Sequence, residues 1–374
     1  MFELEEVKGE IAKIKVVGVG GAGGNMVNNM IAASLRHVEF VAMNTDSQAL
    51  GISLAQRRVQ LGDAVTRGLG AGSKPELGRR SAEESREDIA AALCGVDMIF
   101  ICAGMGGGTG TGGSPVVAQV AKDLGALTVG VVTKPFFYEG TRRRHNAETG
   151  IKELEKHVDT LITIPNDRIS YAVDKNTSLL ESFARANDVL RQAVQGISDL
   201  IVIPGLINLD FADVRTIMEE AGSAVMGMGV AAEAKEAAKA AINNPLLENS
   251  SVEGARGILV NITGGLDLSL KDVEEAAGLV YDSAHAEANI IFGAVIHPDL
   301  KNECRVTVIA TGFAPRKQKL EIPVKKWAPP KEEITLKGSS KILAKSLKPE
   351  GGPLSFEDTF DIPTFLRKEP TKQL

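Results

Sequence analysis

Two glycine-rich segments carry the residues of this sequence that are best suited to binding an anion. The first glycine loop is Gly18–Gly24 and the second is Gly104–Gly113. Each follows an apolar, strand-like run and leads into a helix-like one. Glycine lets backbone N–H groups approach an anion closely, and a helix N-terminus adds partial positive charge. Two such loops at one site predict a ligand with several phosphates, such as a nucleoside triphosphate.

The phosphate-binding chemistry differs from that of a lysine-containing P-loop, because no Gly-Lys-Ser or Gly-Lys-Thr follows either loop. Backbone N–H groups and the hydroxyls of Thr109 and Thr111 must then do most of the binding. Gly18-x-Gly20-x-x-Gly23 also fits a dinucleotide fingerprint, with Asp46 placed for a ribose. An NAD-dependent oxidoreductase is therefore an alternative. It leaves the second loop unexplained, and no His, Tyr or Lys arrangement clearly supplies hydride transfer.

Two carboxylates close the segment Pro204–Asp213. Asp210 is placed to cap a helix that begins at Phe211, with Asp213 in its first turn. Alternatively, both carboxylates polarise an attacking water. In the same pocket as a triphosphate they would be repelled, a problem that disappears if a second subunit brings them. Both interpretations stay open on the residues alone.

A charged turn offers further ligand-binding groups. Thr141–Arg144 opens a helix immediately after Glu139. At least two of the three arginines, Arg142, Arg143 and Arg144, are explained by a charged turn that faces solvent and binds no ligand. One guanidinium suits phosphate geometry, and Glu139 suits a ribose hydroxyl.

The elements that position these residues alternate from about Ile11 to Thr163. The predicted strands are Ile14–Val19, Glu39–Asn44, Met98–Ala103, Leu127–Lys134 and Thr160–Pro165. The predicted helices are Asn25–Ala33, Ala82–Leu93, Pro115–Leu124 and Thr141–His157, with Pro115 at a first helical position. This order predicts an α/β fold with a doubly wound parallel sheet, and ligands at the carboxyl ends of its strands.

A long helix and a smaller unit follow. Apolar residues recur at spacings of three and four from Leu179 to Ile201, which predicts one helix of about 23 residues and roughly 34 Å. A second, smaller α+β domain is expected over 221–315. Its predicted elements are the helix Ala231–Ile242, the strand Gly257–Ile262, the helix Leu270–Ala288, and the strands Ala294–His297 and Arg305–Gly312.

The C-terminal part changes composition. Arg316–Glu350 holds ten basic residues against four glutamates and lacks apolar periodicity, which predicts a disordered linker. The apolar segment Phe356–Lys368 then favours a short docking peptide over a segment packed on the parent domain.

Bulk composition is that of a soluble globular protein, with 44% hydrophobic and 24% charged residues. A net charge of −6 argues against broad nucleic-acid binding. Three scattered cysteines favour reduced thiols over disulfides or a metal site, and Cys102 is expected to be buried. The acidic N-terminus and the lack of a long apolar run predict a cytoplasmic protein without direct membrane insertion.

Three motifs together resemble the tubulin/FtsZ family of GTPases, and in particular its bacterial cell-division members. They are Gly106–Gly112, Asn208–Asp213 and the terminal Asp361–Leu366. The resemblance covers about residues 10–316 and the terminal peptide. It implies a GTPase that assembles head to tail into protofilaments and forms the division ring. A non-hydrolysing nucleotide-binding scaffold is a further alternative, which Asp210 and Asp213 argue against.

The resemblance also implies roles for individual residues. Phosphate contacts would come from both glycine loops and one connecting loop, the ribose would meet Glu139 and Arg143, and the guanine would meet Asn166, Phe183 and Asn187. The full set is Gly21, Ala22, Gly23, Gly24, Asn25, Ala71, Gly72, Gly106, Gly107, Gly108, Thr109, Gly110, Thr111, Glu139, Arg143, Asn166, Phe183 and Asn187. Phe183 also fits the apolar stripe of the long helix.

By the same resemblance, Asn208, Asp210 and Asp213 would be the catalytic residues, inserted into the nucleotide site of the next subunit. GTP or GDP is the expected ligand, with Mg²⁺ on the phosphates and no dedicated metal site. The partners implied are further copies of the chain and membrane-tethering or regulatory division proteins. The latter would bind Asp361, Ile362, Pro363, Phe365 and Leu366 at the division site, on the inner face of the membrane.

The expected domain organisation combines these observations. It comprises an N-terminal extension (1–10), a GTP-binding domain (11–177) and a central helix (178–203). A synergy loop, which is the loop expected to enter the next subunit's nucleotide site, and its following helix occupy 204–220. A C-terminal α+β domain (221–315), a flexible linker (316–355) and a docking peptide (356–374) follow.

Overall fold

The computed structural model describes residues 12–169, 178–203, 205, 207, 209–245, 254–297, 300 and 302–313. All belong to the first of two compact units, Met1–Lys317 and Gln318–Leu374. Several predictions fall outside the described residues: the N-terminal extension, the linker, Asn208, and the docking peptide with Asp361, Ile362, Pro363, Phe365 and Leu366.

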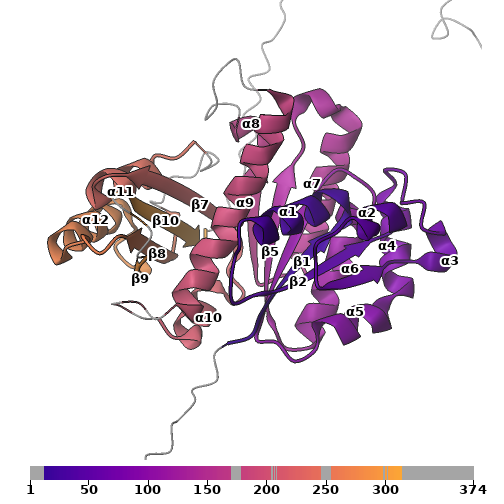
Figure 1. The fold of residues 1–374 in the computed structure, drawn as a ribbon, viewed down its shortest axis with the longest axis horizontal. Helices are drawn as coiled ribbons and strands as arrows, with labels where there is room; N and C mark the ends of the chain where they lie inside the picture. The colour runs from indigo at the N-terminus through magenta and orange to yellow at the C-terminus, as the bar shows by residue number, and fades with distance from the viewer. Residues whose placement is uncertain are drawn as a thin grey trace, which may run out of the picture. The chain divides into compact units, whose positions relative to one another are not determined.

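A parallel sheet organises the first half of the chain (Figure 1). Its strands lie in the order β3-β2-β1-β4-β5-β6, and every neighbouring pair is parallel. They are β1 Ile14–Val19, β2 Glu39–Asn44, β3 Arg57–Gln60, β4 Met98–Gly104, β5 Leu127–Lys134 and β6 Thr160–Pro165. The doubly wound arrangement and its five predicted strands are confirmed. The four-residue β3 lacks an apolar pattern because its two arginines are exposed.

Helices bury both faces of this sheet. They are α1 Gly20–Ala32, α2 Ser47–Gly51, α3 Asp63–Thr66, α4 Pro75–Glu84, α5 Arg86–Leu93, α6 Thr109–Asp123, α7 Thr141–Glu155 and α8 Asn166–Ile169, with a 3₁₀ turn at Phe137–Glu139. Alternate residues of β4 enter two separate cores: Phe100 joins one, and Ile99 and Ile101 join the other. Burial on both faces explains why the parallel strands are continuously apolar.

Three predicted helix boundaries were wrong, and two of the corrections bear on the site. α1 begins at Gly20 and α6 at Thr109, so Pro115 lies inside α6 and is not its first residue. The glycine loops therefore form the first helical turns themselves. The predicted helix Ala82–Leu93 is divided at Ser85, whose hydroxyl accepts a hydrogen bond from the Gly62 N–H.

The long helix is α9, Leu179–Val202, of 24 residues. The middle of its apolar stripe is buried, with Leu190, Ala193 and Ile197 at zero exposure. Figure 1 shows it between the parallel sheet and the elements that follow.

The second part continues the same sheet as β7-β10-β8-β9. Its elements are α10 Phe211–Met218, β7 Gly222–Ala231, α11 Ala234–Ile242, β8 Gly257–Gly264, α12 Leu270–Ser283, β9 Asn289–Ile296 and β10 Cys304–Thr311. β7 pairs in parallel with β6 and antiparallel with β10, β10 pairs antiparallel with β8, and β8 pairs in parallel with β9. The mixed α/β fold with a smaller α+β part is confirmed.

Element boundaries in this part differ from those predicted. β7 was not predicted, because its glycines and methionines give no strand pattern, and α11 therefore begins at Ala234. α12 ends at Ser283, which leaves β9 room to begin at Asn289. None of the helices within the described ranges is long and apolar enough to cross a membrane.

Candidate functional site

A pocket of about 390 Å³ lies at the carboxyl ends of the parallel strands. The chain runs from β1 toward β2 and β3 on one side, and from β4 toward β5 and β6 on the other. Ligands bind doubly wound sheets where the strand order reverses in this way. Twelve of the residues predicted to bind nucleotide line the pocket: Gly21, Ala22, Ala71, Gly72, Gly107, Gly108, Thr109, Gly110, Glu139, Arg143, Asn166 and Phe183.

The remaining six predicted residues do not line it. Gly24 and Asn25 line a smaller pocket of about 190 Å³, which shares Gly20 and Gly21 with the first. The other four, which line neither of these two pockets, are Gly23, Gly106, Thr111 and Asn187.

Close backbone contacts hold the glycine loops together. A Cβ on Gly23 would lie 2.4 Å from the carbonyl oxygen of Cys102. Because glycine has no Cβ, α1 can pack directly on β4. A Cβ on Gly20 would lie 2.8 Å from the backbone nitrogen of Gly110, and Gly20 has a positive φ. At Gly21 and Gly107, by contrast, a Cβ would meet nothing within 4 Å. The two loops are thus locked against each other while part of their backbone faces open space.

Both predicted hydroxyls take part in the loops' own hydrogen bonds. The Thr109 and Thr45 hydroxyl oxygens lie 2.6 Å apart, and the Gly106 N–H donates to the Thr111 hydroxyl oxygen over 2.8 Å. Gly106 has a φ of 105°, and a Cβ there would approach the carbonyl oxygen of Arg143 to 2.7 Å. In this structure Thr111 shapes the second loop, and Thr109 lies at the pocket wall.

Glu139 and Arg143 form an ion pair at the pocket edge. The other carboxylate oxygen of Glu139 accepts a hydrogen bond from the Phe136 N–H over 2.8 Å. The arginine side chain stays 46% exposed. The pair therefore has a fixed carboxylate and a guanidinium that remains accessible to an anion.

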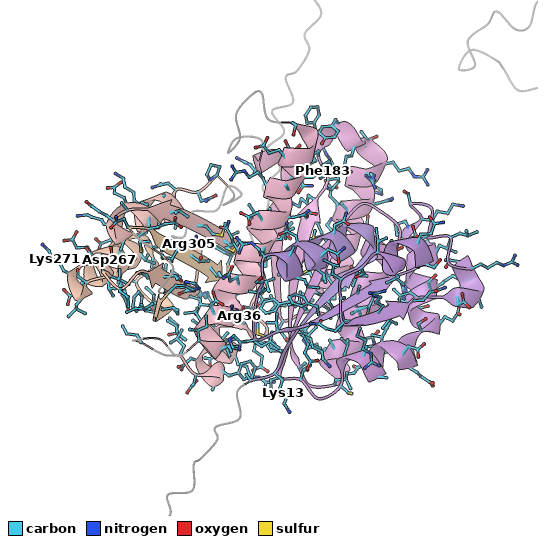
Figure 2. The ribbon with its side chains drawn as sticks, viewed as in Figure 1. Lys13, Arg36, Phe183, Asp267, Lys271 and Arg305 are labelled. Atoms are coloured by element: carbon cyan, nitrogen blue, oxygen red, sulfur yellow. The ribbon has the colours of Figure 1, made fainter. Side chains whose placement is uncertain are left out.

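Two further lining residues, Asn166 and Phe183, suit a planar, polar ring. The Asn166 side chain is buried, and its Oδ1 has no hydrogen-bond partner within the described part of the chain. Phe183 is 39% exposed at the N-terminal end of α9 (Figure 2). Its ring meets Phe136 edge-on, with centroids 5.4 Å apart. An unsatisfied buried amide is costly unless a ligand completes it, and an exposed aromatic face offers stacking.

Several lining residues were not predicted for this ligand. Asn44 and Thr133 stand at the ends of β2 and β5, a position that sequence analysis can identify. Asp46 also lines the pocket, but its carboxylate caps α2 by accepting from the Gln48 and Ala49 N–H groups. That local role weakens its assignment as a dinucleotide ribose ligand.

The two carboxylates predicted to act on water lie elsewhere. Asp210 caps α10, with its Oδ1 accepting from the Asp213 N–H over 2.8 Å. Both residues are exposed, and neither is among those that line the pocket. The predicted capping role of Asp210 is confirmed, and the single chain leaves the two carboxylates outside the pocket.

The cysteine of β4 does not line this pocket. Cys102 is buried as predicted, and burial raises the pKa of its thiol to about 12. No group of three or more His, Cys, Asp or Glu side chains within the described ranges is arranged to hold a metal ion.

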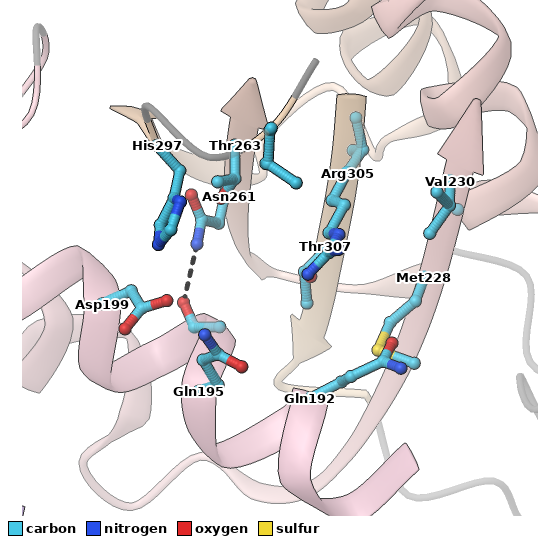
Figure 3. A pocket seen from close by; sticks show the side chains of 14 residues that line it. Gln192, Gln195, Asp199, Met228, Val230, Asn261, Thr263, His297, Arg305 and Thr307 are labelled. Atoms are coloured by element: carbon cyan, nitrogen blue, oxygen red, sulfur yellow. Dashed lines mark hydrogen bonds between the residues drawn. The ribbon is translucent and has the colours of Figure 1, made fainter. Parts of the chain in front are cut away.

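A separate pocket, of about 310 Å³, lies between α9 and strands β7, β8 and β10 (Figure 3). The Asn261 amide crosses it to donate to the Gly196 carbonyl oxygen over 3.0 Å. Burial raises the pKa of Asp199 at this pocket to about 6, although hydrogen bonding to Gln195 and the charge of His297 oppose the shift.

Comparison with known families identifies both halves of the described fold. Residues 13–174 match the family model "Tubulin/FtsZ family, GTPase domain", and residues 222–314 match "FtsZ family, C-terminal domain". The chain is similar to an empty FtsZ dimer from M. jannaschii, with 44% identity and a TM-score of 0.77, over 80% of this chain and 88% of that one. The chain is also similar to a point mutant of FtsZ from M. jannaschii, with 43% identity and a TM-score of 0.77, over 81% of this chain and 92% of that one.

More distant structures share the fold. CetZ1 from Haloferax volcanii, described as a GDP-bound monomer, is 22% identical with a TM-score of 0.71, over 81% of this chain and 95% of that one.

Proposed function

Because the chain belongs to the tubulin/FtsZ family of GTPases, we propose that it is a self-assembling cytoskeletal protein of the bacterial division ring. It binds GTP in the 390 Å³ pocket and hydrolyses it only where two subunits meet. The observation that carries this proposal is the separation of the exposed Asp210 and Asp213 from the residues that line the pocket.

The residues that line the pocket suit the different parts of GTP. Open backbone at Gly21 and Gly107, in the first turns of α1 and α6 or beside them, faces the phosphates. Arg143 adds the guanidinium, and Glu139 is near the ribose. Asn166 binds the guanine edge and Phe183 stacks on it. Asn187, one helical turn beyond Phe183 on α9, was expected to bind the same edge but does not line the pocket in the single chain. Mg²⁺ on the phosphates would reduce their negative charge.

Hydrolysis follows from a head-to-tail arrangement. The end of α10 that carries Asp210 and Asp213 enters the pocket of the next subunit, where a carboxylate polarises the water that attacks the γ-phosphate. A triphosphate and two carboxylates would repel each other in a permanently shared pocket. Bringing them together only on assembly avoids that cost and links turnover to polymer formation. The similar structures described as an FtsZ dimer from M. jannaschii and as a protofilament of CetZ2 from Haloferax volcanii support self-association.

The proposal extends to the linker and the terminal peptide. The linker 316–355 lets the terminal peptide reach membrane-tethering and regulatory partners, with an r.m.s. span of roughly 30–40 Å. The protein is then cytoplasmic and assembles at the division site on the inner face of the membrane. A GTP-binding domain over 11–177 and a C-terminal domain over 221–315 are part of the same proposal.

The decisive experiment measures GTP hydrolysis per chain against protein concentration, with Mg²⁺ present. Activity that rises steeply above a threshold supports a site completed by the next subunit. Activity that stays constant per chain at every dilution would mean a self-contained site. The oxidoreductase alternative is not favoured for a chain with a GTPase domain, and phosphate release would exclude the non-hydrolysing scaffold.

A further inference from the structure

Helix α10 carries the proposed catalytic carboxylates at one end and is anchored at the other. It has eight residues, from Phe211 to Met218, and a length of about 12 Å. Asp210 caps its N-terminus and Asp213 lies in its first turn. A two-turn helix moves as a rigid rod, so contacts at its C-terminal end set the direction in which the carboxylates project.

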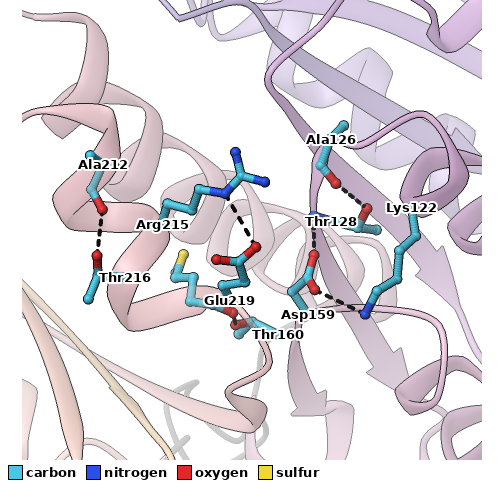
Figure 4. Close-up of polar contacts among 10 residues, drawn as sticks. Lys122, Ala126, Thr128, Asp159, Thr160, Ala212, Arg215, Thr216 and Glu219 are labelled. Carbon is cyan, nitrogen blue, oxygen red and sulfur yellow. Dashed lines mark hydrogen bonds and ion pairs between the residues drawn. The ribbon is translucent and has the colours of Figure 1, made fainter.

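One buried hydroxyl makes the shortest of these contacts. The Thr160 hydroxyl donates to the Met218 carbonyl oxygen over 2.5 Å, and Thr160 has zero exposure (Figure 4). The last carbonyls of a helix have no partners within the helix, so an outside donor is required. Thr311 of β10 adds a weaker contact, because its one hydroxyl proton is shared between the Ile217 and Gly257 carbonyl oxygens, each 3.3 Å from the hydroxyl oxygen.

The strand that supplies this hydroxyl is itself fixed. Thr160 is the first residue of β6 and pairs with Gly222, the first residue of β7. The Gly222 N–H donates to the carbonyl oxygen of Asp159 over 2.9 Å. The carboxylate of Asp159 in turn accepts from the Thr128 N–H at 2.9 Å and pairs with Lys122 at 3.1 Å. Figure 4 shows the contacts of Asp159 with Thr128 and Lys122 near Thr160.

We propose that Thr160 is a positioning residue for hydrolysis, holding α10 at the angle at which Asp210 and Asp213 reach the next subunit's nucleotide. This inference rests on the proposed function. Thr160 touches neither nucleotide nor water and acts only through the Met218 carbonyl. It lies at the opposite end of β6 from Asn166, which lines the pocket. Removing its hydroxyl should therefore change turnover and leave nucleotide binding intact.

The test compares Thr160→Val with Thr160→Ser and with a matched control, Thr128→Val. The Thr128 hydroxyl is equally buried and lies on the neighbouring strand β5, but it donates to the Ala126 carbonyl oxygen over 3.0 Å and not to a carbonyl of α10. For Thr160→Val we expect kcat to fall about tenfold, since small misplacements of catalytic groups cost one to two orders of magnitude. The KM for GTP and the assembly threshold should change less than about twofold. Thr160→Ser should restore kcat.

The outcomes separate this inference from its premise. A wild-type kcat in Thr160→Val, an equal loss in Thr128→Val, or a failure of Thr160→Ser to restore turnover would overturn the positioning role. If wild-type protein in the same series hydrolyses no GTP, or does so independently of concentration, the proposed function itself fails. If Thr160→Val does not fold by circular dichroism, Thr311→Val replaces it, with a loss of about threefold expected and unchanged turnover contradicting the proposal.

Discussion

Asp210 and Asp213 differ in what they do for their own chain. The Asp210 side chain caps α10, whereas Asp213 contributes its backbone N–H to that cap and leaves its carboxylate exposed. Substitution of Asp213 therefore removes a carboxylate without removing a cap.

For Asp213→Ala we expect normal GTP affinity and a loss of turnover of about a hundredfold, the usual scale for removing a general base. Equilibrium binding of labelled GTP and phosphate release above the assembly threshold measure the two quantities. Thr216→Ala is a control on the same helix, because it removes only an exposed hydroxyl bonded to the Ala212 carbonyl. Undiminished phosphate release in Asp213→Ala would remove its assigned role.

Asp199 gives a prediction about pH. Burial raises its pKa from 3.8 to about 6 in the folded protein. Below about pH 4 the carboxyl is protonated in both the folded and unfolded states. Between about pH 4 and pH 6 the unfolded state has lost its proton while the folded state still holds it, so folding stability falls over this window and levels off above it.

Asp199→Asn should remove this loss. We expect the variant to gain about 2 kcal/mol in free energy of unfolding at pH 7.5 relative to wild type, and to gain little at pH 4. Urea denaturation at both pH values measures the difference. Asp188→Asn is a control on the same helix, because that carboxylate is more exposed and is paired with Arg191. An equal gain for Asp199→Asn at both pH values would contradict the titration argument.

At the scale of elements, the glycine loops act as the first turns of α1 and α6. A Cβ on Gly108 would lie 2.7 Å from the Cβ of Ala71 and 3.0 Å from the Lys74 nitrogen. Any side chain there must displace the connecting loop that carries Ala71 and Gly72, which also lines the pocket.

Gly108→Ser is therefore expected to weaken GTP binding at least tenfold, which corresponds to about 1.4 kcal/mol. Equilibrium dialysis with GTP tests it. Gly278→Ser in α12 is the matched control, because a Cβ there meets nothing within 4 Å. Unchanged affinity in Gly108→Ser would argue against the placement of the phosphates between these loops.

Sequence patterns predicted the strands of the parallel sheet and missed details that depend on tertiary contacts. Apolar runs of six to eight residues predicted β1, β4 and β5 because both faces of those strands are buried. β7 was missed because tertiary packing, and not strand propensity, requires some of its residues. At Gly229, for example, a Cβ would lie 2.0 Å from the Ala237 carbonyl oxygen of α11, so only glycine fits. The true starts of α1 and α6 were also missed, since glycine rarely favours a helix.

The candidate site was predictable to the extent that it sits at strand ends. Glycine spacing and family resemblance located the pocket, and most of the named residues line it. The unpartnered Oδ1 of Asn166 and the internal bond of Thr111 depend on distances that no spacing encodes. The contact between Thr160 and Met218 joins residues 58 positions apart and has no signature in either segment.

At the scale of the whole molecule, one continuous sheet joins the nucleotide pocket to the part that follows α9. Because β7 pairs with both β6 and β10, it belongs to both parts. The proposed function places self-assembly and hydrolysis in residues 12–313 and partner capture in the terminal peptide. This division of labour can be tested by truncation.

Deletion of Asp361–Leu374 removes the predicted docking residues and leaves every pocket-lining residue in place. We expect GTP turnover and the assembly threshold to stay within about twofold of wild type, and binding to membrane-tethering division proteins to be lost. Co-sedimentation of preformed filaments with a purified tethering protein measures capture, and phosphate release measures turnover. Deleting a matched stretch of the linker should preserve capture, because the r.m.s. span of a flexible chain falls only with the square root of its length. Loss of folding after the terminal deletion would instead mean that the peptide packs on the parent domain.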